Sequence, residues 1–165
     1  MTKTSFDPRK AIREKIGTLK RNFDDKINTY NLQITVGGSI HNTVNVPMYL
    51  AEEVKSGTIK EMPYMDMNLA DCSYEPHDIL ASTRKVDCYI DIGLWFADTD
   101  NVDVTSFGKK VCDQISNLIR THQSTTDGIT FMNVESIVNI REIKAHQVIY
   151  HVVITVYCLY YDLCS

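Results

Sequence analysis

The chain has 165 residues, of which 44% are hydrophobic and 23% are charged. This composition is typical of an ordinary globular protein and excludes intrinsic disorder and collagen-like repeats. Because a domain usually takes about 100 to 200 residues, we expect one compact domain. The 17 basic and 21 acidic residues leave a net charge of −4, which disfavours a dedicated reader of duplex DNA.

Neither targeting segments nor cysteine pairing is indicated. The N-terminal residues are charged where a signal peptide would be apolar, and the most apolar run, Val148 to Tyr161, is too short to span a bilayer. An odd number of cysteines without a C-x-x-C pair fits neither a disulfide framework nor a zinc ribbon. We therefore expect synthesis in a reducing, intracellular compartment, without export or membrane insertion. The cysteines are Cys72, Cys88, Cys112, Cys158 and Cys164.

The N-terminal region predicts a helix followed by a short strand. Asp7 and Pro8 form a helix-start signal, an N-cap carboxylate followed by proline at the first helical position. Apolar residues then recur at helical spacing, which predicts an amphipathic helix from Pro8 to about Asn22. Leu32–Val36 is typical of a short strand.

The next region is the least regular part of the chain. Residues 37–61 mix polar residues, proline and glycine, with room for a short helix around Met48 to Lys55. Met62–Cys72 can form a strand, although its alternation is poor. Residues 73–83 are expected to form a loop, and loops of that length usually have a function.

The clearest strand lies in the middle of the sequence. From Lys85 to Ala97 apolar and polar positions alternate, which predicts a half-buried strand. The predicted inner face consists of Val86, Cys88, Ile90, Ile92, Leu94 and Phe96. An apolar stripe at helical spacing then predicts a second helix from about Thr105 to His122.

The last quarter of the sequence predicts a hairpin. Ile129–Ile140 and Ala145–Leu159 are β-type runs separated by Arg141–Lys144, a connection short enough for antiparallel neighbours. The second run is apolar or aromatic at both odd and even positions, so we expect both of its faces to be covered.

These elements predict an α+β fold: a single domain over residues 1–165, with a mostly antiparallel sheet of about four to five strands and two main helices packed on one face. Within it we expect an N-terminal helix at 8–22, an irregular segment at 37–61 and a sheet core at 62–162.

The second face of the predicted sheet carries large side chains where a solvated face would be polar. Either the first helix or the irregular segment covers this face within the chain, or it is a subunit interface, for which tryptophan and tyrosine are preferred anchors. The side chains that define this hypothesis are Tyr89, Trp95, Tyr157, Leu159 and Tyr161.

Catalytic and metal-binding patterns are weak. Cys72 and His77 are a conceivable nucleophile and base, but the sequence shows neither the contact nor the orienting partner that such a pair needs. Further metal ligands at a recognised spacing are missing, and no phosphate-binding loop is found. We therefore predict no catalytic, cofactor or metal site.

Carboxylates cluster more than the composition requires. Paired acids could support glycosidase chemistry, but nothing in the sequence builds a cleft for them. A solvated acidic rim is the simpler interpretation of these residues. If the protein formed a ring, such a rim facing the lumen would repel the DNA backbone. The residues of this hypothesis are Asp66, Asp71, Glu75 and Asp78.

From about Leu32 to Asp162 the chain resembles the tail-terminator and tail-completion proteins of tailed bacteriophages. The similarity rests on the strand Arg84-Lys85-Val86-Asp87-Cys88-Tyr89-Ile90-Asp91-Ile92, on the helix between strand pairs, and on the closing stretch ITFMNVESIVNIREIKAHQVIYHVVITVYCLYYD. The resemblance implies a structural virion protein, not an enzyme and without cofactors.

As a member of that family the chain would form a homo-oligomeric ring, expected to be a hexamer, at the head-proximal end of the tail. It would stop growth of the tail tube and join the tail to the neck. Its partners would be further copies of itself, the tail tube protein, a neck or connector protein and, in a contractile tail, the sheath protein. DNA would pass only as cargo, no membrane would be involved, and the protein would be made in the host cytoplasm and end in the virion.

Three alternatives remain open at this point. The chain could be another neck component, such as a head-to-tail adaptor or a collar subunit. It could be a small intracellular hydrolase or transferase that uses Cys72, His77 or a pair among its aspartates, namely Asp66, Asp71, Asp87 and Asp91. It could also be a monomeric binding module whose aromatic sheet face holds a peptide or small ligand.

Overall fold

The computed structural model describes residues 6–18, 31–35, 43–54, 62–80, 82–97, 104–144 and 147–163. In chain order the elements are α1 (Pro8–Gly17), β1 (Asn31–Thr35), β2 (Thr43–Leu50), α2 (Ala51–Val54), β3 (Tyr64–Pro76), β4 (Thr83–Ala97), α3 (Val104–Thr121), β5 (Phe131–Lys144) and β6 (Gln147–Leu163). Five strands form a mixed sheet in the order β2-β3-β4-β6-β5, and β1 extends it beyond β2. Only β2 and β3 run parallel; the other neighbours are antiparallel. The chain is thus a single α+β domain, as the sequence predicts.

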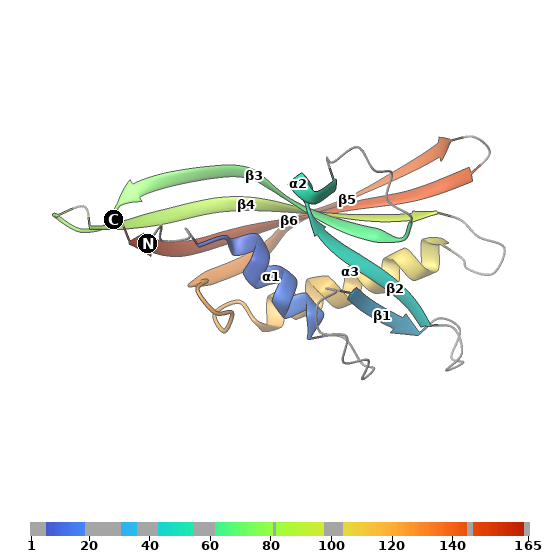
Figure 1. Cartoon of the computed structure of the whole chain (residues 1–165), viewed down its shortest axis with the longest axis horizontal. Coiled ribbons are helices and arrows are strands. Elements are labelled where there is room, and N and C mark those ends of the chain that lie inside the picture. Colours follow the sequence, from blue (N-terminus) through green and yellow to red (C-terminus); the bar gives the residue numbers. More distant parts are fainter. Residues whose placement is uncertain are drawn as a thin grey trace.

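Both main helices lie on the same side of the sheet (Figure 1). On that side β4 buries every residue of the predicted inner face, and β6 buries Val152, Ile154, Val156, Cys158 and Tyr160. Helix α3 adds Val111, Ile115 and Ile119 to this core, and α1 adds Ile12 and Ile16. The core therefore lies between the helices and one face of the sheet.

Helix α3 approaches the sheet closely at a glycine. A Cβ atom added to Gly108 would lie 2.4 Å from ring carbons of Tyr150 on β6 and 3.5 Å from the ring of Phe96 on β4. The Tyr150 hydroxyl in turn donates a hydrogen bond of 3.2 Å to Asn139 on β5. The absence of a side chain at Gly108 therefore lets α3 rest directly on an aromatic ring.

Helix α1 begins as predicted but is shorter. Asp7 caps it by accepting a hydrogen bond of 3.0 Å from the backbone N–H of Arg9. The helix ends at Gly17, where the Thr18 hydroxyl and backbone N–H both bond to the carbonyl of Lys15. Glycine is a poor helix former and threonine closes the last turn, which explains the end at Gly17; residues 19–22 of the expected helix lie outside the described part of the chain.

The segment expected to be irregular, residues 37–61, contains a strand and one helical turn where it is described. Val46, Met48 and Leu50 alternate into the core, and Met48 and Leu50 lie opposite Met65 and Met67 of β3. The expected short helix is confined to α2. Polar neighbours and Pro47 hide this alternation in the sequence, and three of its core positions lie among the residues whose burial is described.

The strands that follow are longer than expected, and the expected loop at 73–83 is wrong in its first part. Strand β3 continues to Pro76, and its register with β4 shifts between Leu69 and Asp71. This β-bulge reverses which residues point inward, which explains the poor alternation of the sequence there.

A second bulge lies in β5, between Val134 and Ser136. Residues 141–144, expected to be a connection, belong to β5, and β6 begins at Gln147.

The β3–β4 hairpin projects beyond the rest of the domain (Figure 1). Within β3, strand β2 pairs only with Met65–Met67, so among the described residues Asn68–Pro76 of β3 form an open edge of the sheet. At the other edge, β5 has β6 as its only described strand neighbour. The domain is thus elongated, with the hairpin at one end and the paired end of β5 and start of β6 at the other (Figure 1).

Candidate functional site

The face of the sheet opposite the helices is the candidate functional surface, and we call it the open face. Tyr89 lies opposite Tyr157 in the β4–β6 register, and Trp95 lies opposite His151. Their strand neighbours on either side are the buried core residues, so these side chains point away from α1 and α3. Leu159 and Tyr161 follow Tyr157 on the same face of β6.

The first helix therefore does not cover the open face, which was one of the alternatives left by the sequence. Of residues 37–61 only β2 and α2 are described, and β2 joins the edge of the sheet. The five residues of the interface hypothesis do share the open face. They are half-buried except Tyr161, which is exposed.

An aromatic row crosses one end of the open face. The rings of Tyr64 and Trp95 are stacked with centroids 6.0 Å apart, and Trp95 stacks on His151 at 3.5 Å. Tyr49 of β2 meets Tyr64 edge to face at 6.3 Å. The row spans four strands and lines this end of the open face with aromatic rings. The sequence pattern does not indicate Tyr49 and Tyr64, because they lie on segments whose alternation is poor. It does not single out His151 either, because a histidine on a strand is not an apolar signal, although it shares the face of Tyr157.

Asp66 lies beside this row and apart from the other acids. Its Oδ1 occupies the space above Gly93, where a Cβ atom would approach it to 2.2 Å. Burial raises the pKa of the Asp66 carboxyl, and the adjacent Trp95 indole and Gly93 backbone N–H offset part of that rise. The buried Nε1 of Trp95 nevertheless makes no hydrogen bond of ordinary geometry.

A second aromatic group occupies the middle of the open face. Tyr157 contacts Tyr89 with ring centroids 5.6 Å apart and Phe131 at 6.3 Å. Its hydroxyl donates a hydrogen bond to the carboxylate of Asp87, which also lies 3.2 Å from the Lys85 ammonium. The bond to Asp87 raises the pKa of Tyr157 to about 12, and the same bond lowers the pKa of Asp87.

The remaining acids do not form a catalytic pair. Asp91 accepts a hydrogen bond of 2.7 Å from the Thr155 hydroxyl, so Asp87 and Asp91 are each bound to a hydroxyl of β6. Asp71 and Glu75 lie along the projecting part of β3, and Asp78 lies in the loop at its end. The acidic rim is therefore divided: three of its four residues share the hairpin, and Asp66 lies beside Trp95.

Cys72 and His77 do not lie in one loop and do not face each other. Cys72 is in β3 opposite Cys88, on the core side of the sheet, and burial raises the pKa of its thiol to about 11. His77 packs its ring against Tyr161, which belongs to the open face, with centroids 4.6 Å apart. The described residues also include no group of three or more histidine, cysteine, aspartate or glutamate side chains placed to hold a metal ion.

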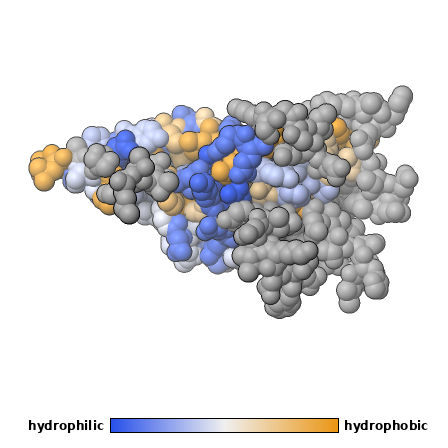
Figure 2. Space-filling view, in the orientation of Figure 1, coloured by the Kyte–Doolittle hydropathy of each residue, from blue (hydrophilic) through white to orange (hydrophobic). Residues whose placement is uncertain are grey.

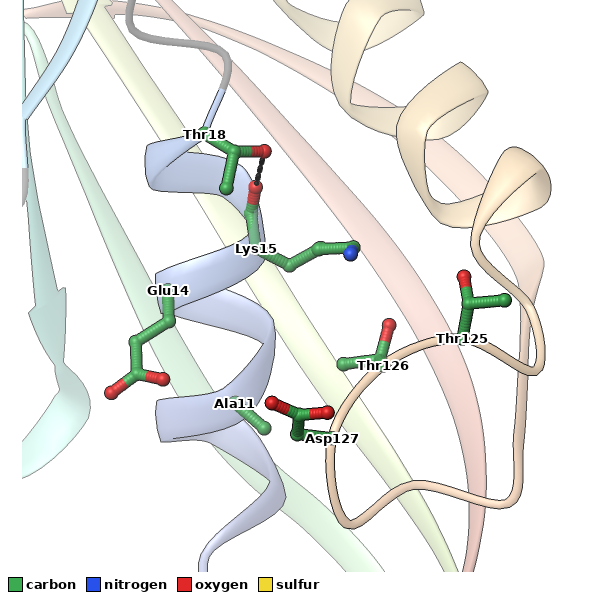
Figure 3. A pocket seen from close by; sticks show the side chains of 7 residues that line it. All are labelled: Ala11, Glu14, Lys15, Thr18, Thr125, Thr126 and Asp127. Carbon is green, nitrogen blue, oxygen red and sulfur yellow. Dashed lines mark hydrogen bonds between the residues drawn. The ribbon is translucent and has the colours of Figure 1, made fainter.

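A hollow of about 210 Å³ lies on the helix side, between α1 and the turn that follows α3 (Figure 3). Lys15 points across it toward Thr126, and Glu14 points away. The Thr18 hydroxyl is already bonded to the carbonyl of Lys15. A lysine, an aspartate (Asp127) and hydroxyls line the hollow, without a nucleophile held by a base, so it offers no catalytic arrangement.

A scan against protein-family models finds none that matches the chain, and a search of curated proteins finds no match either. Among the described helices, none is long and apolar enough to cross a membrane.

Proposed function

We propose that the chain is the subunit of a homo-oligomeric ring at the head-proximal end of a bacteriophage tail, where it stops growth of the tail tube and joins the tail to the neck. The observation that carries this proposal is the open face: a sheet whose two helices share one side and whose other side presents aromatic side chains. The proposal also uses the resemblance of the sequence to the tail terminators.

The open face is suited to packing against another protein. Large aromatic side chains are the residues whose burial contributes most to protein interfaces. Two polar pairs between them are already satisfied, since Tyr157 bonds to Asp87 and Thr155 bonds to Asp91. Covering these groups costs less than covering unpaired ones, because a buried polar group is costly mainly when it lacks a partner.

In this function the chain is structural and has no reaction to catalyse. A hexamer is the expected ring, with the tube protein and a neck protein bound to its two axial surfaces and, in a contractile tail, the sheath protein outside. Copies in a closed ring contact each other through two different surfaces, which a small domain with an open face and a projecting hairpin can supply. DNA would cross the lumen only as cargo.

The test combines the mass of the purified protein with its effect on the tube. Six copies of 18.8 kDa give about 113 kDa in a closed cyclic ring, measured by light scattering and seen as annular particles by negative stain. Added to polymerising tail tube protein of the same phage, the ring should limit tube length. A chain that stays monomeric and leaves tube length unchanged contradicts the proposal.

Substitutions locate the contact. Trp95→Asp or Tyr157→Asp should prevent ring formation while circular dichroism shows a folded chain, because a carboxylate would enter an apolar contact. Asn117→Asp, at an exposed position of α3, is the matched control and should leave the ring intact. Rings of unchanged size in both open-face variants would show that this face is not an interface.

Another neck component, such as an adaptor or collar subunit, is the runner-up. Such a protein would form a ring of similar mass, so mass alone does not separate the two. Tube length does, because an adaptor leaves growth of the tube unlimited and a terminator stops it.

A further inference from the structure

The tip of the β3–β4 hairpin, residues 77–80 and 82, presents two aliphatic side chains to solvent. Ile79 is fully exposed and Leu80 is 88% exposed. Figure 2 shows a hydrophobic group at the end of the molecule where Figure 1 shows the tip of the β3–β4 hairpin. The loop is ordered by its own hydrogen bonds: Asp78 accepts from the backbone and hydroxyl of Ser82, and the backbone N–H of His77 donates to Thr83. The two side chains are thus held outward by a closed loop.

The surroundings of the tip extend the apolar patch and add negative charge. Tyr74, Tyr161 and Leu163, on the strands behind the loop, are also exposed. Carboxylates outnumber cations there, and the two cations are engaged: Arg84 with Asp162 at 2.9 Å, and Lys85 with Asp87 at 3.2 Å. The carboxylates are Asp71, Glu75, Asp78, Asp87 and Asp162.

The second half of the edge strand β5, together with the start of α3, has a matching character, and we call this region the β5 end. Ile137, Val138 and Ile140 of β5 are exposed. Val138 and Ile140 lie opposite Val153 and His151 and so belong to the open face, whereas Ile137 lies opposite Ile154 and faces the helix side. Two exposed lysines, Lys109 and Lys110, lie on the solvent side of α3 near its start, and the exposed Asp113 follows one turn later.

The packing of Gly108 on Tyr150 places the two lysines at this end, because Tyr150 pairs with Arg141, the residue after Ile140. Figure 1 shows the start of α3, the end of β5 and the start of β6 at the same end of the molecule.

We propose that the hairpin tip of one copy docks on the β5 end of a second copy, head to tail. Each region offers exposed aliphatic side chains, and Lys109 and Lys110 complement the carboxylates around the tip, with Asp113 one turn beyond them. The tip adjoins Thr83, which pairs with Leu163, whereas Ile140 pairs with His151, twelve residues earlier in β6. The tip of one molecule therefore cannot reach the β5 end of the same molecule, whereas a chain of copies can make this contact. A head-to-tail contact of this kind closes into a ring when its rotation fits. This inference rests on the proposed ring and identifies the contact around its circumference.

The experiment uses two variants of the whole chain and their mixture. The tip variant Ile79→Ser/Leu80→Ser changes only exposed side chains, and the β5 variant Val138→Ser/Ile140→Ser changes exposed positions of an edge strand. Each alone should sediment as a monomer. At the high concentrations that a single weak contact needs, an equimolar mixture should give a heterodimer of about 38 kDa in equilibrium with monomers and nothing larger, because only one intact tip and one intact β5 end remain to meet. Asn117→Ser is the control and should keep the mass of the wild type.

Other outcomes overturn the inference. If both variants keep the mass of the wild type, the contact lies elsewhere; when Tyr157→Asp then dissociates the ring, the proposed function stands without this contact. If the tip variant still forms rings but no longer binds the tail tube, the tip serves that partner instead. If the wild type remains monomeric up to millimolar concentration, the inference fails.

One further outcome separates the contact from the ring. If copies of the wild type join into open filaments and the mixture of variants gives the heterodimer, the contact is supported and the ring is contradicted.

Discussion

Replacing Gly108 by alanine tests how closely α3 packs on the sheet. This packing holds the helix on one side of the sheet and leaves the other side as the open face. The added methyl group would lie 2.4 Å from the Tyr150 ring, far inside the usual contact distance. That ring has little freedom to move away, because its hydroxyl is bonded to Asn139. Gly17, at the end of α1, is a matched control, since a methyl group there meets nothing within 4 Å.

Two opposing contributions set the size of the effect. Alanine in place of glycine inside a helix stabilises it by about 1 kcal/mol. Overpacking a filled site costs about 1 to 3 kcal/mol. We therefore expect Gly108→Ala to lower the free energy of unfolding by up to about 2 kcal/mol, and Gly17→Ala to raise it by a few tenths to about 1 kcal/mol.

Urea denaturation followed by circular dichroism gives the free energy of unfolding of both variants. In thermal unfolding, a change of 1 kcal/mol in that free energy corresponds to a shift of about 2 to 4 °C in Tm for a domain of this size. In a Tyr150→Leu background the cost of Gly108→Ala should shrink, because the ring that causes it is gone. Equal stabilisation by the two glycine replacements, or an unchanged cost in the Tyr150→Leu background, would refute this account of the packing.

Further predictions concern hydrogen-bonded carboxylates. Asp87→Asn should return the pKa of Tyr157 from about 12 toward its ordinary value, read from tyrosine ring-carbon NMR shifts, and Asp91→Asn should leave it unchanged. Because the pKa of Tyr157 is raised on folding, its contribution to stability should be present below about pH 10 and lost as the pH rises toward 12. Asp7→Ala should cost about 1 kcal/mol at neutral pH. Burial alone would raise the pKa of the Asp7 carboxyl, but the hydrogen bonds and the charge of Arg9 keep that pKa below its ordinary value. The stability difference between the wild type and Asp7→Ala should therefore vanish as the pH falls below this lowered pKa.

The fold was predictable where local pattern and tertiary environment agree. In β4 every second residue is buried, so the alternation of the sequence is the alternation of the sheet. In α3 the apolar stripe is the face that packs on β4, β5 and β6, and the observed helix differs from the expected one by a residue at each end. Strand β4 lies at the centre of the sheet and α3 packs against it, so burial dictates the residue types of both elements.

Prediction from the sequence failed where a β-bulge shifts the alternation of apolar and polar residues. It also failed where a strand has few partners in the sheet. The bulges near Ala70 and Glu135 invert the inward side of β3 and β5, which breaks the period of two on which strand prediction rests. Strand β2 pairs with only three residues of β3, so few of its positions need to be apolar. The open-face residues of β4 and β6 could be named because they alternate with the core. The tip residues Ile79 and Leu80 could not, because an exposed aliphatic residue in a loop has no period.

The energetics of the tip decide how a ring built on it would assemble. Fully burying an isoleucine and a leucine contributes about 3 to 6 kcal/mol, or roughly a factor of 10² to 10⁴ in the association constant. Association of two proteins costs about 4 to 15 kcal/mol in lost freedom of motion. The tip alone therefore gives a weak pair, and the lysines and the edge of β5 must contribute the remainder.

Closure changes this balance, because the last copy makes two contacts with a single further loss of freedom. A ring held by individually weak contacts is therefore populated as the closed ring or as monomers, with few species between. Native mass spectrometry over a range of concentrations should show a steep rise of the largest species with dimers to pentamers scarce. A graded ladder of intermediate sizes would instead indicate an open chain, since each added copy would then make one contact of the same strength as the last.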